Sequence, residues 1–371
     1  MRIVFNITGI HQTKMNCDQI SIRGGLGILA LLTLCFTACT ADKETNIPDV
    51  SDIKIDLEVT RFEDLLLADT TIDAARIQKL MDDNPSFSDV YFKHVMPGAE
   101  DMIVTDDPEL KMQTIQAWIR HPRTRWLYDT VKTIFPDIER VKKDLTSAFT
   151  YGKYYFPDVP TPKIYTTISD FGYFPFVYAE DSLRDGIGIS LEMFLGDSFP
   201  YLDYTGLNNA FSDYLTRSYN KDHLARRTLE VWIDDLAGPP PGNRLLDIMI
   251  HNGKKLYILQ SLLPMAPDTV IMDYSSVKMG WVKDNEKNVY YHMTTQDMLY
   301  ETSLNKIQKL IGPSPSSPGM PTESPGNTAS WLGWQIVQAY MAKHPETTLP
   351  QLLGMKDAQA IFDESGYRPP R

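Results

Sequence analysis

Histidines and acidic residues are the side chains of this protein that can bind a metal ion or activate water. The helix that holds zinc in a metallopeptidase needs two histidines four residues apart, with a glutamate beside the first to activate the zinc-bound water. None of the seven histidines has this spacing: they are His11, His94, His121, His223, His251, His292 and His344. Spacing alone therefore assigns no catalytic residue, no metal ligand and no cofactor-binding residue.

Other catalytic patterns are missing from the sequence as well. It contains neither the G-x-S-x-G turn of serine hydrolases nor a phosphate-binding P-loop. Paired acids occur at Asp82-Asp83, Asp106-Asp107 and Asp234-Asp235. Neighbouring side chains point apart on a helix or a strand, so we interpret these pairs as solvated faces or helix caps. The glycine pair Gly186 and Gly188 is interpreted as a turn into a strand.

The three cysteines, Cys17, Cys35 and Cys39, all lie within the first 39 of 371 residues. This placement excludes a disulfide framework, a zinc ribbon and an iron–sulfur site from the rest of the chain. Thiol catalysis beyond residue 39 is excluded for the same reason.

Cys39 ends a segment that has the order of a bacterial secretion signal. Arg23 precedes an apolar stretch at residues 24–38, which is too short to span a bilayer comfortably. Phe36-Thr37-Ala38-Cys39 resembles the bacterial lipobox, with Phe36 where leucine is usual. We predict that residues 1–38 are a signal peptide, with Met15 as a candidate start, and that Cys39 carries a diacylglycerol and an acyl chain such as palmitate. An ordinary cleaved signal and a buried apolar helix are the alternatives.

The acidic charge balance bears on possible partners. The chain has a net charge of −12, and residues 1–38 contain three basic residues and one acidic residue, so the chain from Cys39 onward carries −14. Nucleic-acid binding needs clustered lysine and arginine, so it is not expected. An anionic membrane repels such a chain, so the lipid on Cys39 is the predicted attachment, with residues 39–51 as a lipidated tether.

The pattern of apolar residues predicts a single domain at residues 52–371. Alternation at residues 53–59 predicts a half-buried strand, and a short helix follows at residues 62–67. Further helices are predicted within residues 71–151, 206–262 and 272–310, and strands at residues 162–169, 173–178 and 188–194. Five prolines in residues 312–326 predict a surface loop, or alternatively a docking element. The predicted fold class is α+β, predominantly helical with a small sheet.

Two C-terminal segments allow more specific predictions. A helix is predicted to begin at Asn327-Thr328, with Asn327 as its cap, and to run to Met341. Trp331 and Trp334 share one face of this helix, which favours the core over a partner groove. In the helix predicted near residues 253–263, the lysine pair Lys254-Lys255 is predicted to be solvated.

Six short segments follow one another along the chain. They are Ile55–Phe62 (IDLEVTRF), Lys153–Pro157 (KYYFP), Gly253–Tyr257 (GKKLY), Glu323–Gly326 (ESPG), Trp331–Val337 (WLGWQIV) and Tyr367–Arg371 (YRPPR). Together with the lipobox, they resemble the GldB gliding-motility lipoprotein family of Bacteroidetes. The resemblance covers essentially the whole chain after Cys39.

The resemblance implies a role in surface gliding, alongside envelope proteins linked to the type IX secretion system. It also implies a distant similarity to predicted zinc peptidases. In that comparison, residues 226–235 (RRTLEVWIDD) take the place of the zinc-binding helix without ligand histidines, and Asn252 stands where the family often has a glutamate. Both departures imply a degenerate zincin-like scaffold, in which His223 and His251 are the remaining metal-ligand candidates.

Two functional hypotheses follow. The first is a lipid-anchored protein of the cell envelope that is not an enzyme. It attaches to a membrane through Cys39 and binds other envelope proteins of the gliding or secretion machinery. The second is an envelope zinc metallopeptidase with an unconventional site that uses His223 or His251.

Overall fold

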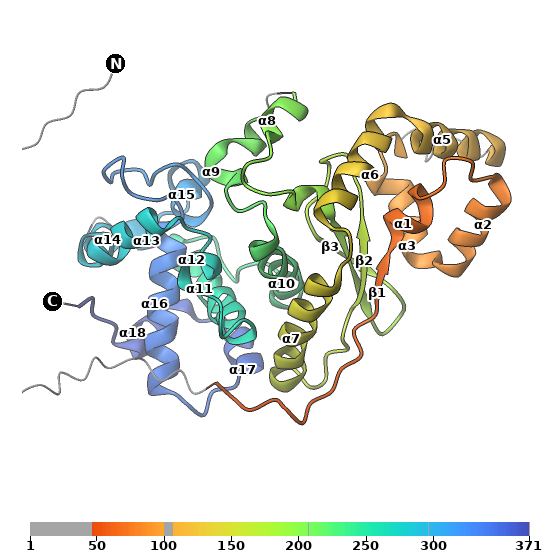
Figure 1. Ribbon diagram of the computed structural model, residues 1–371. Coiled ribbons are helices and arrows are strands. Elements are labelled where there is room, and N and C mark those ends of the chain that lie inside the picture. The colour runs from red at the N-terminus through yellow and green to blue at the C-terminus, as the bar shows by residue number, and fades with distance from the viewer. Residues whose placement is uncertain (1–46, 100–106, 207, 296, 371) are drawn as a thin grey trace, which may run out of the picture. The chain divides into compact units, whose positions relative to one another are not determined.

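The computed structural model describes residues 47–99, 107–206, 208–295 and 297–370. The predicted signal peptide at residues 1–38, the predicted lipidation site Cys39 and residues 39–46 of the predicted tether lie outside these ranges. From Ile47 onward the chain forms one unit that is mostly helical, and its described strands form one small sheet (Figure 1). The predicted α+β fold class is therefore confirmed.

The sheet has four strands in the order β1-β2-β4-β3. β1 (Val59–Arg61), β2 (Lys163–Thr167) and β4 (Asp185–Ser190) are parallel, and β3 (Phe176–Ala179) runs antiparallel to β4. β2 and β4 consist almost entirely of buried residues, as expected for strands covered on both faces.

The strands differ in their bounds from the sequence prediction. Residues 53–58 alternate between more and less exposed positions as predicted, but they are not part of a strand, and only Val59–Arg61 joins the sheet. The strand predicted at residues 188–194 begins earlier, so that Gly186 and Gly188 lie inside β4, and Leu191–Phe194 forms the 3-10 helix η2 instead. Side-chain alternation reports which residues face the core, whereas pairing depends on a partner from another part of the chain.

Helices occupy most of the remaining described residues. Those before β2 are α1 (Phe62–Leu67), α2 (Ala74–Asp83), α3 (Pro85–Val90), the π-helix η1 (Tyr91–Val95), α5 (Pro108–Arg120), α6 (Pro122–Ile134) and α7 (Glu139–Tyr155). After η2 follow α8 (Tyr201–Tyr204), the 3-10 helix η3 (Asn209–Phe211), α9 (Asp213–Thr216) and α10 (Lys221–Ala237). The C-terminal part contains α11 (Leu245–Leu262), α12 (Asp268–Ile271), α13 (Ser276–Asp284), α14 (Glu286–Thr295), the 3-10 helix η4 (Met298–Tyr300), α15 (Leu304–Ile311), α16 (Thr328–Lys343), α17 (Leu349–Gly354) and α18 (Ala358–Ser365).

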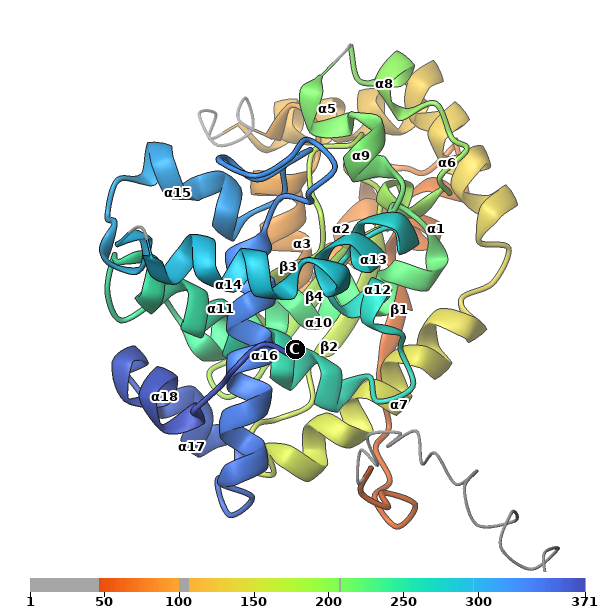
Figure 2. The same ribbon diagram turned by 90° about the vertical axis from the view of Figure 1, so that its left-hand side faces the viewer.

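Helices cover both faces of the sheet (Figure 1). On one face, the ring of Phe62 in α1 lies 4.9 Å from that of Phe87 in α3 and 6.3 Å from that of Tyr165 in β2. On the other face lies α10, whose Trp232 packs edge-on against Phe149 of α7, with a centroid distance of 5.5 Å. Figure 2 shows α10 in front of the strands, so α10 separates the sheet from the helices that follow it in sequence.

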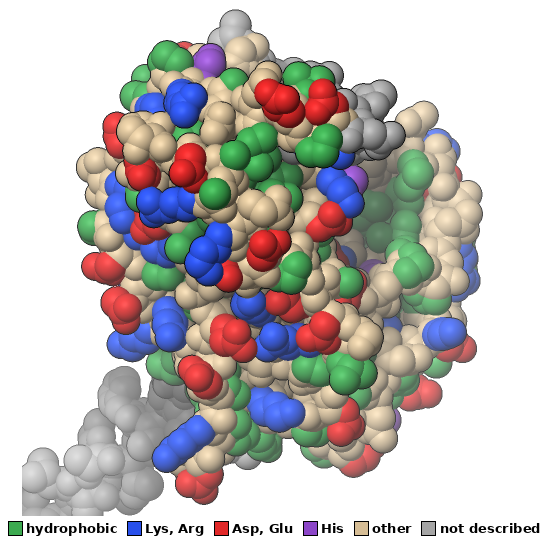
Figure 3. All heavy atoms as spheres, turned by 90° about the vertical axis from the view of Figure 1, so that its right-hand side faces the viewer, with side chains coloured by type: hydrophobic (Ala, Val, Ile, Leu, Met, Phe, Trp, Pro, Cys, Tyr) green, Lys and Arg blue, Asp and Glu red, His purple; other side chains and the backbone are tan. Residues whose placement is uncertain are grey.

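The face around α1, α2 and α5 carries charges of both signs (Figure 3). Exposed ion pairs there include Lys79 with Asp83 at 2.8 Å and Arg76 with Asp69 at 3.1 Å. Acidic side chains are interspersed among the basic ones, which differs from the clustered basic surface that nucleic-acid binding requires.

α11 and α16 make backbone contact where they cross. A Cβ atom added to Gly253 of α11 would lie 2.4 Å from the carbonyl oxygen of Gly333 in α16. One added to Gly333 would lie 2.0 Å from the carbonyl oxygen of Met249. Both positions therefore require glycine. Trp331 and Trp334, which flank Gly333, are each only 1% exposed, so the core prediction for this helix is confirmed.

Glu192 is completely buried in η2, directly after β4. Its Oε1 accepts hydrogen bonds from the backbone N–H and the hydroxyl of Ser169, both at 2.6 Å, and from the N–H of Phe171 at 3.2 Å. Its Oε2 has no hydrogen-bond partner among the described residues. Burial outweighs these hydrogen bonds and raises the pKa of Glu192 from 4.5 to about 7.

The helix crossing generates the first prediction. Gly333→Ala should lower the free energy of unfolding by about 3 kcal/mol, because the added methyl group forces two helix backbones apart. Gly280→Ala in α13 is the matched control, since a Cβ there meets nothing within 4 Å. The control should be neutral or stabilising by up to about 1 kcal/mol. Urea-induced unfolding measures the free energy of unfolding of both variants. Equal stability of Gly333→Ala and Gly280→Ala would contradict the close contact between α11 and α16.

Glu192 generates a pH prediction. The folded protein holds a proton on this group up to about pH 7, whereas the unfolded chain releases it near pH 4.5. The contribution to stability is therefore fully present below pH 4.5 and falls by about 3 kcal/mol as the pH rises to 7. Unfolding measured across this range should show a shallower pH dependence for Glu192→Gln than for the wild type. Glu323→Gln, which alters an exposed glutamate, is the matched control.

Candidate functional site

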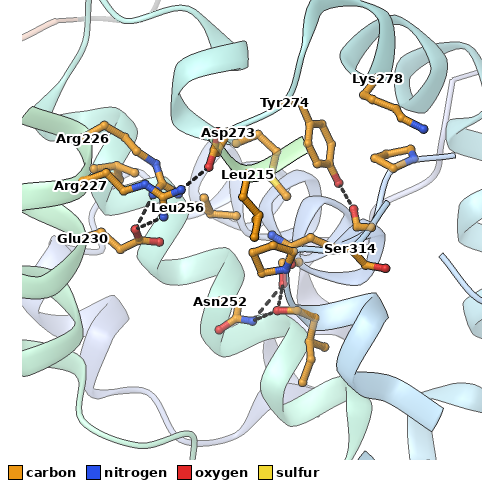
Figure 4. Close-up of a pocket in the computed structure, with 18 of the residues that line it drawn as sticks. Leu215, Arg226, Arg227, Glu230, Asn252, Leu256, Asp273, Tyr274, Lys278 and Ser314 are labelled. Carbon is orange, nitrogen blue, oxygen red and sulfur yellow. Dashed lines mark hydrogen bonds and ion pairs between the residues drawn. The ribbon is translucent and has the colours of Figure 1, made fainter. Parts of the chain in front are cut away.

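A cavity of about 320 Å³ lies among α10, α11, the turn after α12 and the proline-rich loop at residues 312–326 (Figure 4). α10 supplies charged side chains on one side, and α11 supplies Asn252, Leu256 and Leu259. The proline-rich loop closes the opposite side with Pro313, Ser314, Pro315, Pro325 and Gly326. The volume falls at the lower end of the range for small-molecule sites.

The charged wall combines three arginines with two carboxylates. Arg226 and Glu230, one helical turn apart on α10, form an ion pair, and Nη1 of Arg227 lies 3.2 Å from Oε2 of Glu230. Asp273 lies in the turn after α12. Its Oδ2 pairs with Nη2 of Arg227 at 2.5 Å, and its Oδ1 pairs with Nη2 of Arg217 at 3.1 Å. Figure 4 shows Arg226, Arg227 and Glu230 converging on one side of the cavity with Asp273 beside them.

The arginines keep both carboxylates ionised. Burial alone would raise the pKa of Glu230, but Arg226 and Arg227 outweigh it and hold that pKa below the usual value. Asp273 behaves in the same way, with Arg227, Arg226 and Arg217 lowering its pKa against burial. A general acid or base at neutral pH needs a pKa close to 7, so these carboxylates are poorly suited to proton transfer.

The side-chain amide of Asn252 holds together the helices at the floor of the cavity. Nδ2 of Asn252 donates to Oγ of Ser330 at 2.9 Å and to the carbonyl of Ile311 at 3.3 Å. Asn252 therefore ties α11 to the start of α16 and to the end of α15. Beside it, Nζ of Lys255 pairs with Oδ1 of Asp234 on α10 at 2.8 Å, which closes the gap between the two helices.

The proline-rich loop contains neither helix nor strand, as its prolines predict, yet it is firmly attached. Nζ of Lys278 donates to the carbonyls of Glu323 at 2.9 Å and Ser324 at 2.8 Å. The hydroxyl of Tyr274 donates to the carbonyl of Gly326 at 2.6 Å, and the hydroxyl of Ser317 donates to the carbonyl of Pro325 at 2.8 Å. The loop therefore forms a defined wall of the cavity.

Two local predictions near the cavity are wrong. Asn327 precedes α16 in the left-handed conformation, with φ of 60°, and its side chain makes no capping hydrogen bond. Lys254 was predicted to be solvated but is 3% exposed, and its Nζ donates to the carbonyls of Leu353 at 3.2 Å and Met355 at 2.7 Å. The segment that covers Lys254 is distant in sequence.

The two histidine candidates lie on α10 and α11, but neither lines the cavity. Nδ1 of His223 lies 2.9 Å from Oδ1 of Asn220, and burial together with the nearby arginines lowers its pKa against the opposing effect of Asp273. His251 is 5% exposed, and burial together with Lys255 and Lys254 lowers its pKa to about 4. The two lysines oppose the binding of a cation at His251. The described residues contain no group of three or more His, Cys, Asp or Glu side chains arranged to hold a metal ion.

Several cavity residues were not singled out from the sequence: Arg217, Asp273, Tyr274, Lys278 and Ser314. They come from separate segments, and nothing in their local pattern links them. The one available signal was the four-residue spacing of Arg226 and Glu230, which places both on one face of a helix.

The profile of the family described as gliding motility protein GldB matches residues 43–369. The chain belongs to the GldB family of gliding motility proteins. No curated protein and no solved structure matches the chain. None of the helices in the described ranges is long and apolar enough to cross a membrane.

Three of the six segments that resemble the GldB family position the helices and the loop around the cavity. Gly253 of the GKKLY segment and Gly333 of the WLGWQIV segment form the α11–α16 crossing. Gly326 of the ESPG segment packs against Ser314 across the base of the loop, and its N–H donates to the carbonyl of Ser314 at 3.0 Å. In these three segments, a glycine allows one stretch of backbone to approach another closely.

The site generates a metal-binding prediction. Protein produced with added zinc should contain less than about a tenth of an equivalent of zinc, because neither histidine candidate belongs to a group of three or more His, Cys, Asp or Glu side chains within the described residues. Elemental analysis of the purified protein measures this, with His223→Ala and His251→Ala as test variants and exposed His94→Ala as the matched control. Stoichiometric zinc that is lost in either test variant but kept in the control would contradict the prediction.

Proposed function

We propose that this protein is a lipid-anchored, non-catalytic component of the cell envelope. It supports gliding motility or the envelope machinery linked to type IX secretion by binding other envelope proteins. The observation that carries the proposal is the GldB-family match over residues 43–369. The match begins four residues after Cys39, so the predicted anchor directly precedes the family domain.

A non-catalytic role is supported by the charges of the cavity. Each carboxylate of the charged wall is held by two arginines, Glu230 by Arg226 and Arg227, and Asp273 by Arg227 and Arg217. A carboxylate that is fully committed to ion pairs is not available to activate water or to bind a metal ion. The zinc-peptidase alternative finds no support in this arrangement.

Attachment through a lipid is supported by the charge of the mature chain. A net charge of −14 after Cys39 is repelled by an anionic membrane surface. Acyl chains on Cys39 would provide the missing attraction at about 0.8 kcal/mol for each buried methylene group. The proposed anchor thus decides where the protein acts, and the domain after it decides what it binds.

The proposed function predicts a defined phenotype. Deleting the gene in the native host should reduce colony spreading or secretion of type IX cargo, and a plasmid copy of the wild type should restore both. Cys39→Ser should lose metabolic labelling by a palmitate analogue, leave the membrane fraction and fail to restore the phenotype. Cys35→Ser, in the apolar part of the signal, is the matched control and should behave like the wild type.

Two results would contradict the proposal. Unchanged spreading and unchanged secretion in the deletion strain would remove the functional role. Continued acyl labelling of Cys39→Ser would remove the assigned anchor site.

A further inference from the structure

The three arginines of the cavity have N–H groups that form no hydrogen bond with any described residue. Nε of Arg226 donates to the carbonyl of Ile271 at 3.4 Å and Nη1 to Glu230, while Nη2 makes no hydrogen bond within the described chain. Among the residues that the structure describes, Arg217 forms hydrogen bonds only through Nη2, and the buried Nε of Arg227 has no partner. A guanidinium has five N–H donors in a planar fork that matches a carboxylate, so the unused donors suit that ligand.

The charge of the cavity is opposite to that of the whole molecule. Three guanidinium groups share two carboxylates in the charged wall, which leaves a net surplus of one positive charge. Lys278 adds another positive charge, since within the described ranges its ammonium group donates only to backbone carbonyls. The chain as a whole carries −12. An excess of positive charge in a partly enclosed site favours an anionic ligand.

Among the three arginines, Arg226 is the one best placed to hold an anion. Its side chain is 6% exposed and lines the cavity, whereas the side chains of Glu230 and Arg217 at the same wall are 35% and 32% exposed. Solvent therefore reaches the wall while Arg226 stays largely desolvated. A charge–charge hydrogen bond formed at such a position is stronger than one at an exposed surface.

The other part of the lining is apolar. Leu215 and Leu256 lie near the centre of the cavity in Figure 4, and Met272 and Leu259 complete the patch. A ligand that fits both parts needs a negative group at one end and a short apolar body at the other. A volume of about 320 Å³ limits that body to a few carbon atoms or one or two residues.

We infer that this cavity binds a carboxylate with a short apolar substituent, the carboxylate on Arg226 and Arg217 and the substituent against Leu215 and Leu256. Both a free short-chain acid and the C-terminus of a peptide ending in an apolar residue have this chemistry. The inference does not depend on the anchor at Cys39. Absence of binding together with a motility defect would leave the proposed function standing and would remove this inference.

Calorimetry on the full chain in a non-ionic detergent tests the inference with two matched ligand pairs. Hexanoate is compared with hexanamide, and N-acetyl-alanyl-leucine is compared with its C-terminal amide. In each pair the carboxylate should bind at least about tenfold more tightly than the neutral amide, because the amide cannot form charged hydrogen bonds with the arginines. The carboxylate that binds more tightly shows whether the natural ligand is a free acid or the C-terminus of a peptide.

Variants locate the site. Arg226→Gln should weaken carboxylate binding about tenfold without changing amide binding. Arg76→Gln, which alters an exposed arginine on α2, is the matched control and should bind like the wild type. Leu215→Trp fills the apolar part and should abolish binding of all four ligands while the thermal unfolding midpoint is kept. It provides the test even where Arg226→Gln fails to fold.

Three results would overturn the inference. They are no binding of either carboxylate at low millimolar concentration, equal binding of acid and amide, and wild-type binding by folded Leu215→Trp protein.

Discussion

The backbone contact between α11 and α16 is the constraint on which the C-terminal half of this protein depends. Gly253 and Gly333 let the two helices approach so closely that Asn252 reaches both Ser330 and the carbonyl of Ile311. The end of α15 and the start of α16 are thereby held side by side. The proline-rich loop has to leave one and return to the other, so its position at the cavity follows from the crossing.

A second constraint acts on the opposite wall, where charges are buried and must be paired. α10 lies between the sheet and the later helices, so side chains that point away from the sheet enter a partly dry space. A buried ion without a partner costs several kcal/mol, which explains why the arginines of α10 share Glu230 and Asp273. Two carboxylates cannot neutralise three guanidinium groups, and the surplus gives the cavity its preference for an anion.

The differences between the prediction and the structure have a common physical cause. Patterns within one helix were predicted correctly, as with Phe62–Leu67 and the buried tryptophans of α16. The prediction that Lys254 is solvated was wrong, because the segment Leu353–Met355 covers this side chain and accepts its hydrogen bonds. Residues 53–58 have the alternation of a strand, but among the described residues only Glu58 forms a backbone hydrogen bond to a strand, through its carbonyl, which accepts the N–H of Ile164. Asn327 has the residue type of a helix cap, but its backbone is left-handed and its side chain makes no capping hydrogen bond to the helix.

The sequence by itself determined the family, the candidate lipidation site Cys39, the helical character and the lack of a zinc-peptidase motif. Each of these depends on residue types and on spacing along the chain. Only the tertiary structure decided that Arg217, Arg226, Arg227, Glu230 and Asp273 form one wall and that a proline-rich loop closes the cavity opposite them. The physical reason is that ion pairing and burial depend on distances in space. In this fold, those distances are set by helices whose contacts come from separate parts of the chain.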